Sequence, residues 1–270
     1  MKPNIPKSDE VFSYYQPHSG LSSYIAYYSM TKPHTALSSI SPVFIPDLGG
    51  SIIVSRYENH LGLIVWGPFN KLTKIENNQL EPLEQYFIEF QPGGLSRLVF
   101  PNSNELLNQK TPLAEIDFEI NNAIKLIFDR NNYVPSELVS FLDRFFLGLL
   151  ANKRDILENG RHVLSVLQDL GQNRVMNDLS KETHYSKRHI NRYLNALTGV
   201  SGKNYAQVKR FNNATRILKE SSVSIEQAAL LLDYYDTSHF IHDFTVFAGM
   251  SPTDYRKNMS CFYSDSTKRL

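Results

Sequence analysis

Four residues of one predicted helix, Lys187, Arg188, Asn191 and Arg192, carry chemistry suited to reading double-stranded DNA. Arginine can donate two hydrogen bonds to guanine, and asparagine can pair bidentately with adenine in the major groove. A flanking lysine suits a phosphate contact, which positions a helix without reading sequence. Apolar residues at helical spacing centre on the opposite side of the same segment: Ile190, Tyr193, Leu194 and Leu197.

The charge around this segment supports the same interpretation. Residues 183–219 contain eight Lys or Arg and no Asp or Glu. The whole chain is nearly neutral at +1, yet residues 161–270 carry 15 basic against 10 acidic residues, and residues 1–160 carry 13 against 17. That asymmetry indicates an acidic partner for the second half. The alternative is that the charged helix face is merely solvated. Here, however, a turn, a helix cap, apolar periodicity and the lack of acidic residues occur together, which favours contact with DNA.

The elements that position these residues form two similar units. Ser186 is placed to cap the first reading helix through its hydroxyl. A long helix over 203–219 follows, then a helix over 225–232, a turn over 233–236 and a second reading helix. The outward residues of this second reading helix are further predicted DNA contacts: Thr237, Ser238, Ile241 and His242. Two basic residues of the linking helix, Lys209 and Arg210, are candidates for phosphate contact or for scaffolding.

The two units repeat with a 50-residue period. Gly199, Ser201 and Tyr205 of the first correspond to Gly249, Ser251 and Tyr255 of the second, and Ser186 likewise corresponds to Asp236. Two reading helices on one rigid linker can enter successive major grooves, about 34 Å apart. The pattern predicts a tandem helix-turn-helix domain.

The first half has strand signals followed by helical ones. Short β-branched or aromatic runs at 41–47, 49–55, 61–69 and 85–90 are separated by Gly, Pro, Asn and Asp turns. They favour a small antiparallel sandwich or barrel, with either a ligand pocket or a packed interior. From about Leu113, two amphipathic helices close this domain or pack against a second subunit. The predicted class is α+β, divided into 1–110 (β-rich), 111–158 (helical connector), 159–260 (DNA-binding) and 261–270 (tail).

Several classes of protein are disfavoured. The single cysteine, Cys261, excludes an internal disulfide framework, and isolated histidines do not have metal-ligand spacing, so no metal or cofactor is expected. No sequence motif indicates catalysis. No apolar run approaches the length of a membrane span, and the N-terminus lacks a signal-peptide pattern. We therefore expect a cytosolic protein that does not contact membranes.

The residues of the second half resemble the AraC/XylS family of bacterial transcription regulators. The similarity covers roughly Arg161 to Asn258 and is strongest over 236–256, where Ser238-His239-Phe240, Gly249, Ser251-Pro252 and Tyr255-Arg256 match the family pattern. Leu179, Ser186, Arg192, Gly199, Ser201, Tyr205 and Arg210 match in the first unit. The resemblance implies seven helices with two helix-turn-helix units. The first half resembles an uncharacterised domain of some members, which implies a cupin-like fold with a sensing or dimerising role.

The sequence departs from the family pattern in three places. Asp233-Tyr234 replaces the usual Gly-Phe, but Asp tolerates the left-handed backbone better than most residues. His242 replaces the usual Arg, which weakens a DNA contact and makes it pH-sensitive. Gly202 replaces a common Pro. We expect the second unit to bind DNA less strongly than the first.

The sequence therefore predicts a sequence-specific regulator that binds double-stranded DNA, with RNA polymerase, a small-molecule effector and a second copy of the chain as further partners. One rival is an interaction protein whose helix pairs serve a protein partner. The other is an enzyme like the alkyltransferases joined to similar domains, which would need a reactive cysteine in the first half, where none occurs.

Overall fold

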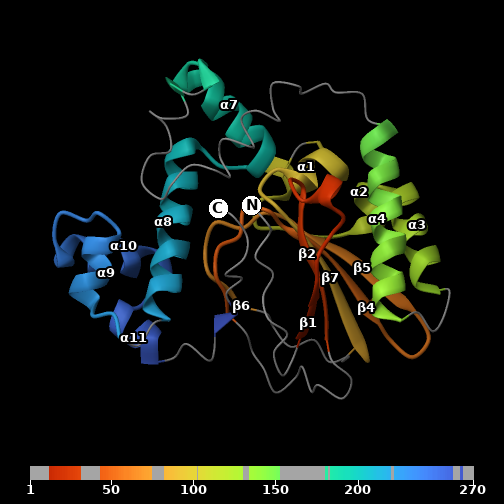
Figure 1. Ribbon diagram of the computed structural model, residues 1–270, viewed down its shortest axis with the longest axis horizontal. Coiled ribbons are helices and arrows are strands. Elements are labelled where there is room, and N and C mark those ends of the chain that lie inside the picture. The colour runs from red at the N-terminus through yellow and green to blue at the C-terminus, as the bar shows by residue number, and fades with distance from the viewer. Residues whose placement is uncertain are drawn as a thin grey trace.

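A computed structural model describes residues 12–31, 43–74, 82–101, 103–129, 134–152, 180–181, 183–219, 222–257 and 262–263. A β-sheet part with covering helices lies beside an all-helical part, and the long helix α8 (Gly202–Leu218) runs between them (Figure 1). The predicted α+β class is confirmed. The start of the region that resembles the AraC/XylS family, residues 161–179, lies outside the described residues, and so does Cys261.

Six antiparallel strands form the main sheet in the order β1-β2-β7-β4-β5-β8. They are β1 (Phe12–Tyr15), β2 (Ile25–Thr31), β4 (Ser51–Arg56), β5 (Leu61–Trp66), β7 (Glu84–Phe90) and β8 (Lys110–Pro112). The predicted runs at 49–55, 61–69 and 85–90 became β4, β5 and β7. In the centre Ile52 pairs with Val65 on one side and Ile88 on the other. These β-branched side chains suit a pleated surface that is covered by other elements.

A smaller sheet joins distant parts of the chain. Its order is β6 (Thr73–Lys74), β3 (Val43–Phe44) and β9 (Phe262–Tyr263), with β9 parallel to β3. The segment 261–270, predicted to be a tail, thus returns a strand to the first half of the chain.

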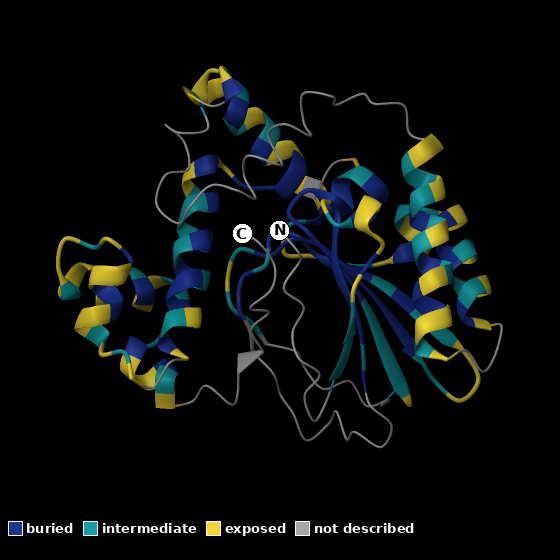
Figure 2. Cartoon of the chain, viewed as in Figure 1, coloured by how far each residue is buried: buried dark blue, intermediate teal, exposed yellow. Residues whose placement is uncertain are grey.

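Helices cover one face of the main sheet. They are α1 (Gly94–Leu98), α2 (Leu113–Ile116), α3 (Phe118–Asp129) and α4 (Pro135–Asn152), with 3-10 turns η1 (Ser19–Leu21) and η3 (Ser103–Leu106). The helices bury their inner sides and expose their outer sides (Figure 2). Phe128 and Phe146 belong to the same core as Val54 and Phe90, and the Phe90 and Phe146 ring centroids lie 6.1 Å apart. The connector helices therefore pack within the chain, and this face of the sheet is filled by the protein's own side chains.

The helical part contains α7 (Lys187–Thr198), α8, α9 (Ile225–Leu231), α10 (Thr237–Ala248) and α11 (Pro252–Lys257). Each of these helices starts within one residue of its predicted position, because the caps and turns fix the boundaries. Among the described residues, no helix is long and apolar enough to cross a membrane. The described part of the chain also shows no cluster of three His, Cys, Asp or Glu that could hold a metal.

Candidate nucleic-acid interface

The first unit holds α7 in a fixed register. The Ser186 hydroxyl accepts a hydrogen bond from the His189 backbone N–H at 3.3 Å, which caps the helix as predicted. The helix ends at Gly199, whose φ of 75° is the left-handed conformation that glycine adopts without strain. Ile190 and Leu194 are fully buried. Because these two residues define the inner side, the opposite side of α7 must face solvent.

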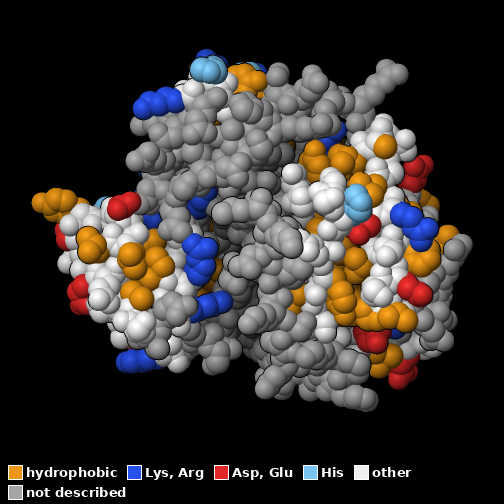
Figure 3. Space-filling view, viewed as in Figure 1, with side chains coloured by type: hydrophobic (Ala, Val, Ile, Leu, Met, Phe, Trp, Pro, Cys, Tyr) orange, Lys and Arg blue, Asp and Glu red, His pale blue; other side chains and the backbone are white. Residues whose placement is uncertain are grey.

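That outer side of α7 is basic and exposed. Lys187, Arg188 and Arg192 are all exposed, and basic side chains stand out over α7 in Figure 3. The face continues into a hollow between α7 and the start of α8. The hollow is lined by Lys187, Asn191, Arg192, Asn195, Ser201 and Lys203. Lys203 and Asn195 were not among the predicted contacts, although the acid-free window includes both.

Asn191 also makes a contact within the protein. Its side-chain oxygen accepts a hydrogen bond from the Gly202 backbone N–H at 2.8 Å, and the residue is half-buried. Bidentate pairing with adenine needs both the oxygen and the amide nitrogen. In this structure one lone pair of the Asn191 oxygen is engaged by Gly202, so Asn191 has a structural role on α7, and its contact with adenine stays a prediction.

Arg192 is supported by an aromatic stack on its own helix. Its Nη2 lies 3.4 Å from His189 Nδ1. The His189 ring stacks on Tyr185 at 4.8 Å and lies 4.7 Å from the Tyr193 ring. The stack restricts the rotamers of His189, so the guanidinium of Arg192 has a positioned neighbour while it stays exposed to solvent.

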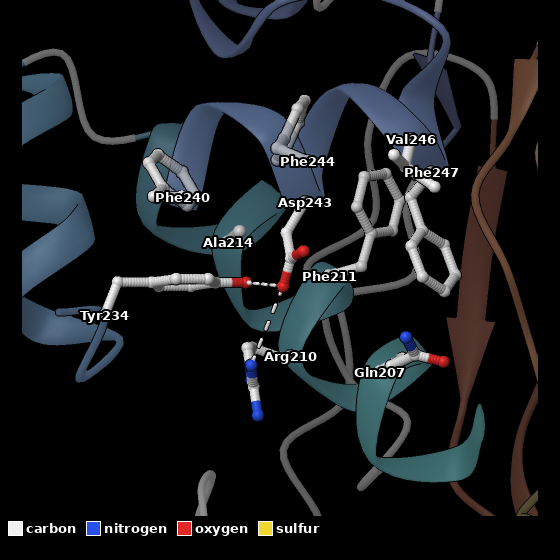
Figure 4. A pocket seen from close by; sticks show the side chains of 10 residues that line it. All are labelled: Gln207, Arg210, Phe211, Ala214, Tyr234, Phe240, Asp243, Phe244, Val246 and Phe247. Carbon is white, nitrogen blue, oxygen red and sulfur yellow. Dashed lines mark hydrogen bonds and ion pairs between the residues drawn. The ribbon is translucent and has the colours of Figure 1, made fainter. Parts of the chain in front are cut away.

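Of the two residues predicted to contact phosphate or to act as scaffold, Lys209 is buried and Arg210 is half-buried. Lys209 is 2% exposed, and burial lowers the pKa of its ammonium group to about 8. Of the two roles predicted for Lys209, its burial favours the scaffold one, and a phosphate contact stays a prediction. Arg210 lies 3.8 Å from Asp243 and sits over the Tyr234 ring, whose hydroxyl donates to Asp243 at 3.4 Å (Figure 4). Arg210 therefore ties α8 to α10, the scaffold alternative predicted for it.

The second unit is built by the same kinds of cap. The Ser224 hydroxyl and the Gln227 side chain form a capping box at the start of α9. Asp236 accepts from the His239 backbone N–H at 2.7 Å and caps α10. Asp233 has a φ of 55°, the left-handed conformation expected where the family pattern has Gly. The turn therefore survives the substitution.

The predicted contacts of the second unit lie on one side of α10. Ser238, Ile241 and His242 are exposed, and Thr237 is half-buried at the first position of the helix. Phe240 and Phe244 are buried on the inner side. His242 Nδ1 lies 3.8 Å from Asp243 Oδ1, so a carboxylate adjoins this surface.

The helical part is attached to the sheet part by specific contacts. Asn212 on α8 donates to the Pro46 carbonyl at 2.8 Å, and Asn70 donates to Asn204 at 3.0 Å. Ser96 on α1 donates to the Ala196 carbonyl at 3.2 Å. Leu48, from the segment before β4, is buried in the core formed by α7 and α8. The orientation of both helix-turn-helix units is thus coupled to the sheet part through α8.

Residues 179–258 match the family described as "Helix-turn-helix domain". This range includes both capped units and the helix that joins them. The C-terminal part of this chain is an AraC-type helix-turn-helix domain. The predicted tandem helix-turn-helix arrangement is confirmed in the described residues, and the reading of DNA by α7 and α10 stays a prediction.

Two curated relatives from Bacillus subtilis share this part. The uncharacterized HTH-type transcriptional regulator YtdP is 21% identical over 135 residues, which span 50% of this chain and 17% of the relative. The uncharacterized HTH-type transcriptional regulator YfiF is 29% identical over 103 residues, 38% of this chain and 31% of the relative. The matched region thus spans less than a third of either relative.

The chain can also be aligned over most of its length with a solved structure. Wild-type ToxT from Vibrio cholerae, bound to an unsaturated fatty acid, has 14% sequence identity and a TM-score of 0.41. The alignment covers 93% of this chain and 96% of that chain.

Proposed function

We propose that this protein is a transcription regulator that binds double-stranded DNA in a sequence-specific way. The observation that carries the proposal is the exposed face of α7, where Lys187, Arg188 and Arg192 adjoin a hollow lined by Lys203. It lies in a window without a single acidic residue. A face of this kind attracts phosphates through counterion release and offers donors to base edges.

Basic residues of α7 and of the start of α8 have two different roles in DNA binding. Arg188 and Arg192 contact base edges in the major groove, and Lys187 and Lys203 contact phosphates on either side. On α10, Ser238 and His242 supply hydrogen-bonding groups, Ile241 suits the methyl group of thymine, and Thr237 lies at the helix start. Because α10 has no Lys or Arg, its contribution to affinity is smaller than that of α7.

Regulation acts through the sheet part. A small-molecule effector bound in residues 1–110 would change the contacts that Pro46, Leu48 and Asn70 make with the helical part. In this scheme 111–158 connects the parts and contributes its outer side to a homodimer, 159–260 binds DNA, and 261–270 is a tail that returns to β3 through β9. RNA polymerase is the downstream partner. The protein acts by binding rather than by catalysis, in the cytoplasm.

Selection of bound fragments from a random pool of double-stranded DNA tests the proposal. We expect one recurrent sequence, and an affinity for it that falls linearly with the logarithm of salt concentration. Replacing Lys187 and Lys203 by Gln should weaken binding to all sequences and reduce the salt slope by about 1 for each phosphate interaction that is removed. Lys125→Gln on α3 is the matched control and should change neither quantity.

The rival function is a helix-turn-helix protein that serves a protein partner and does not primarily bind DNA. If the selection enriches no DNA sequence and the Lys187 and Lys203 variants leave the salt slope unchanged, the result would favour that rival. Recovery of a sequence motif that requires Arg188 and Arg192 would exclude it.

A further inference from the structure

The two helix-turn-helix units have opposite charge. The first lies in the window 183–219, with eight Lys or Arg and no acid. From Glu220 to Tyr255 the chain contains no Lys or Arg at all. Within α9, the turn and α10 there are four acidic residues, Glu226, Asp233, Asp236 and Asp243. This charge weakens the attraction of the second unit for phosphate and favours cationic groups.

The same unit exposes large apolar side chains where α9 ends. Leu230, Leu231 and Tyr235 are 75%, 59% and 95% exposed. They lie within six consecutive positions, and hydrophobic side chains gather over this end of the molecule with acidic ones at their margins (Figure 3). Scattered single apolar residues are ordinary on protein surfaces, whereas a contiguous patch marks an interaction site.

The outward direction of these side chains is fixed by the packing of α9. Ala228, Ala229 and Leu232 are buried and supply the inner side of the helix. The capping box at Ser224 sets where the helix begins. A rotation that buried Leu230 and Leu231 would expose the core residues, so the unit has no internal use for the two leucines.

We propose that Leu230, Leu231 and Tyr235, rimmed by Glu226, Asp233 and Asp236, form a docking surface for a protein segment that combines apolar with Lys or Arg side chains. We call these six residues the α9 patch. An amphipathic basic helix has this chemistry: its apolar stripe covers the leucines and its cations meet the carboxylates. Glu226 lies one helical turn before Leu230, so an acid adjoins the apolar centre directly.

Two other occupants fit the patch less well. Nucleic acid would bring phosphates against three carboxylates and gain no hydrogen bond from leucine. A second copy of this chain could offer its basic α7 and α8. However, in the described residues no large hydrophobic side chain of α7 or α8 is exposed, so such a contact would match the charge and leave the apolar centre uncovered.

Two synthetic helical peptides test the proposal on the full-length chain by fluorescence anisotropy. Both carry the same leucine stripe, and their polar positions hold Lys in one and Glu in the other. We expect the Lys peptide to bind at least about tenfold more tightly than the Glu peptide, a difference of about 1.4 kcal/mol. Binding of the Lys peptide should weaken with added salt.

Variants then locate the binding. Leu230→Ser and Leu231→Ser should each lower the affinity for the Lys peptide by about tenfold or more, because each removes apolar area that the peptide would cover. Leu83→Ser, at a leucine 61% exposed elsewhere on the protein, should leave it unchanged. All three substitutions are at exposed positions, and thermal unfolding will verify that the variants are folded.

Four results would overturn the proposal. Equal binding of the two peptides, or an equal loss in Leu83→Ser, would show that association is not directed by the α9 patch. A loss of DNA affinity in Leu230→Ser and Leu231→Ser as large as their loss of peptide affinity would make the patch a DNA contact. A concentration-dependent dimer in sedimentation that these variants dissociate would assign the patch to a second copy. If the patch is correct and the chain does not bind DNA, peptide binding persists and only the DNA selection fails.

Discussion

The side-chain oxygen of Asn191 lies 2.8 Å from the backbone nitrogen of Gly202. This contact joins the middle of α7 to the first residue of α8 and satisfies one of the N–H groups that a helix start leaves unpaired. The Ser201 hydroxyl satisfies another by accepting from Asn204 N–H at 3.3 Å. Asn191 therefore helps to fix the angle between α7 and α8 from within the basic surface of α7.

Asn191→Ala should lower the free energy of unfolding by about 1 kcal/mol, because the Gly202 N–H loses its partner. Asn191→Asp keeps an acceptor and should retain most of the stability. Its added negative charge should nevertheless weaken DNA binding at every sequence. Denaturant unfolding and DNA titration of both variants measure the two effects. If Asn191→Ala leaves stability unchanged but abolishes preference for one base, the residue reads DNA instead.

Arg192→Ala should weaken binding to the selected site by about 1–3 kcal/mol and relax the preference at one base pair, since the variant cannot form a bidentate pair. Arg192→Lys keeps the charge without the fork geometry, so it should relax the preference with a smaller loss of affinity. The measurement is a binding selection with each variant. A uniform loss over all sequences would make Arg192 a phosphate contact.

The helices of the second half could be predicted because local signals define them. Ser186, Ser201 and Asp236 cap their helices through their own side chains. Gly199 and Gly249 end theirs with positive φ. Hydrophobic periodicity then determined the inner side of each helix, and with it the exposed face of α7.

Contacts between elements distant in sequence could not be predicted. Nothing in the sequence around Lys209 distinguishes it from Lys203, yet Lys209 is buried and Lys203 is exposed, because α8 packs between two other parts of the protein. Asn191 likewise has the spacing of a reading residue, and its hydrogen bond to Gly202 depends on the angle between two helices. The pairing of β9 with β3 joins positions more than two hundred residues apart, for which the chain carries no periodic signal.

Asp233 supports a stability prediction because its φ is 55°. Asp233→Ala should lower the free energy of unfolding by about 1 kcal/mol, since alanine disfavours the left-handed conformation. Asp233→Asn, which tolerates it, should change stability by less than about half of that amount. Thermal or denaturant unfolding compares the two variants. Equal losses would show that the aspartate charge, not the backbone, accounts for the effect.

Leu48→Ala should destabilise the protein by about 2–5 kcal/mol, the range for truncating a buried leucine. Because Leu48 packs with Ile190 and Leu194, we also expect faster hydrogen exchange in α7, although the substitution lies in the first half of the chain. Leu83→Ala, at an exposed leucine, is the matched control and should leave exchange unchanged. If exchange increases only in the sheet, the two parts are not coupled through Leu48.

Lys209 gives the protein a characteristic dependence on alkaline pH. Burial lowers its pKa from 10.5 to about 8 in the folded protein. Between these values the unfolded chain keeps the proton that the folded chain has released, so the unfolded state binds more protons and the free energy of unfolding rises with pH. The contribution of Lys209 approaches about 1.4 kcal/mol per pH unit within this window.

Denaturant unfolding between pH 7 and about pH 9.5 measures this contribution as the difference between the wild type and Lys209→Met. The upper limit is set by tyrosines. The pKa of Tyr86 and that of Tyr255 are raised to about 12, chiefly by burial, whereas an unfolded tyrosine ionises near 10.0. The stabilisation that comes from keeping these two tyrosines neutral is therefore complete below pH 10 and decreases above it. Above pH 10 the tyrosines lower the free energy of unfolding as pH rises, whereas deprotonation of Lys209 raises it. Parallel pH profiles for the two proteins would show that Lys209 is protonated alike in the folded and unfolded chains.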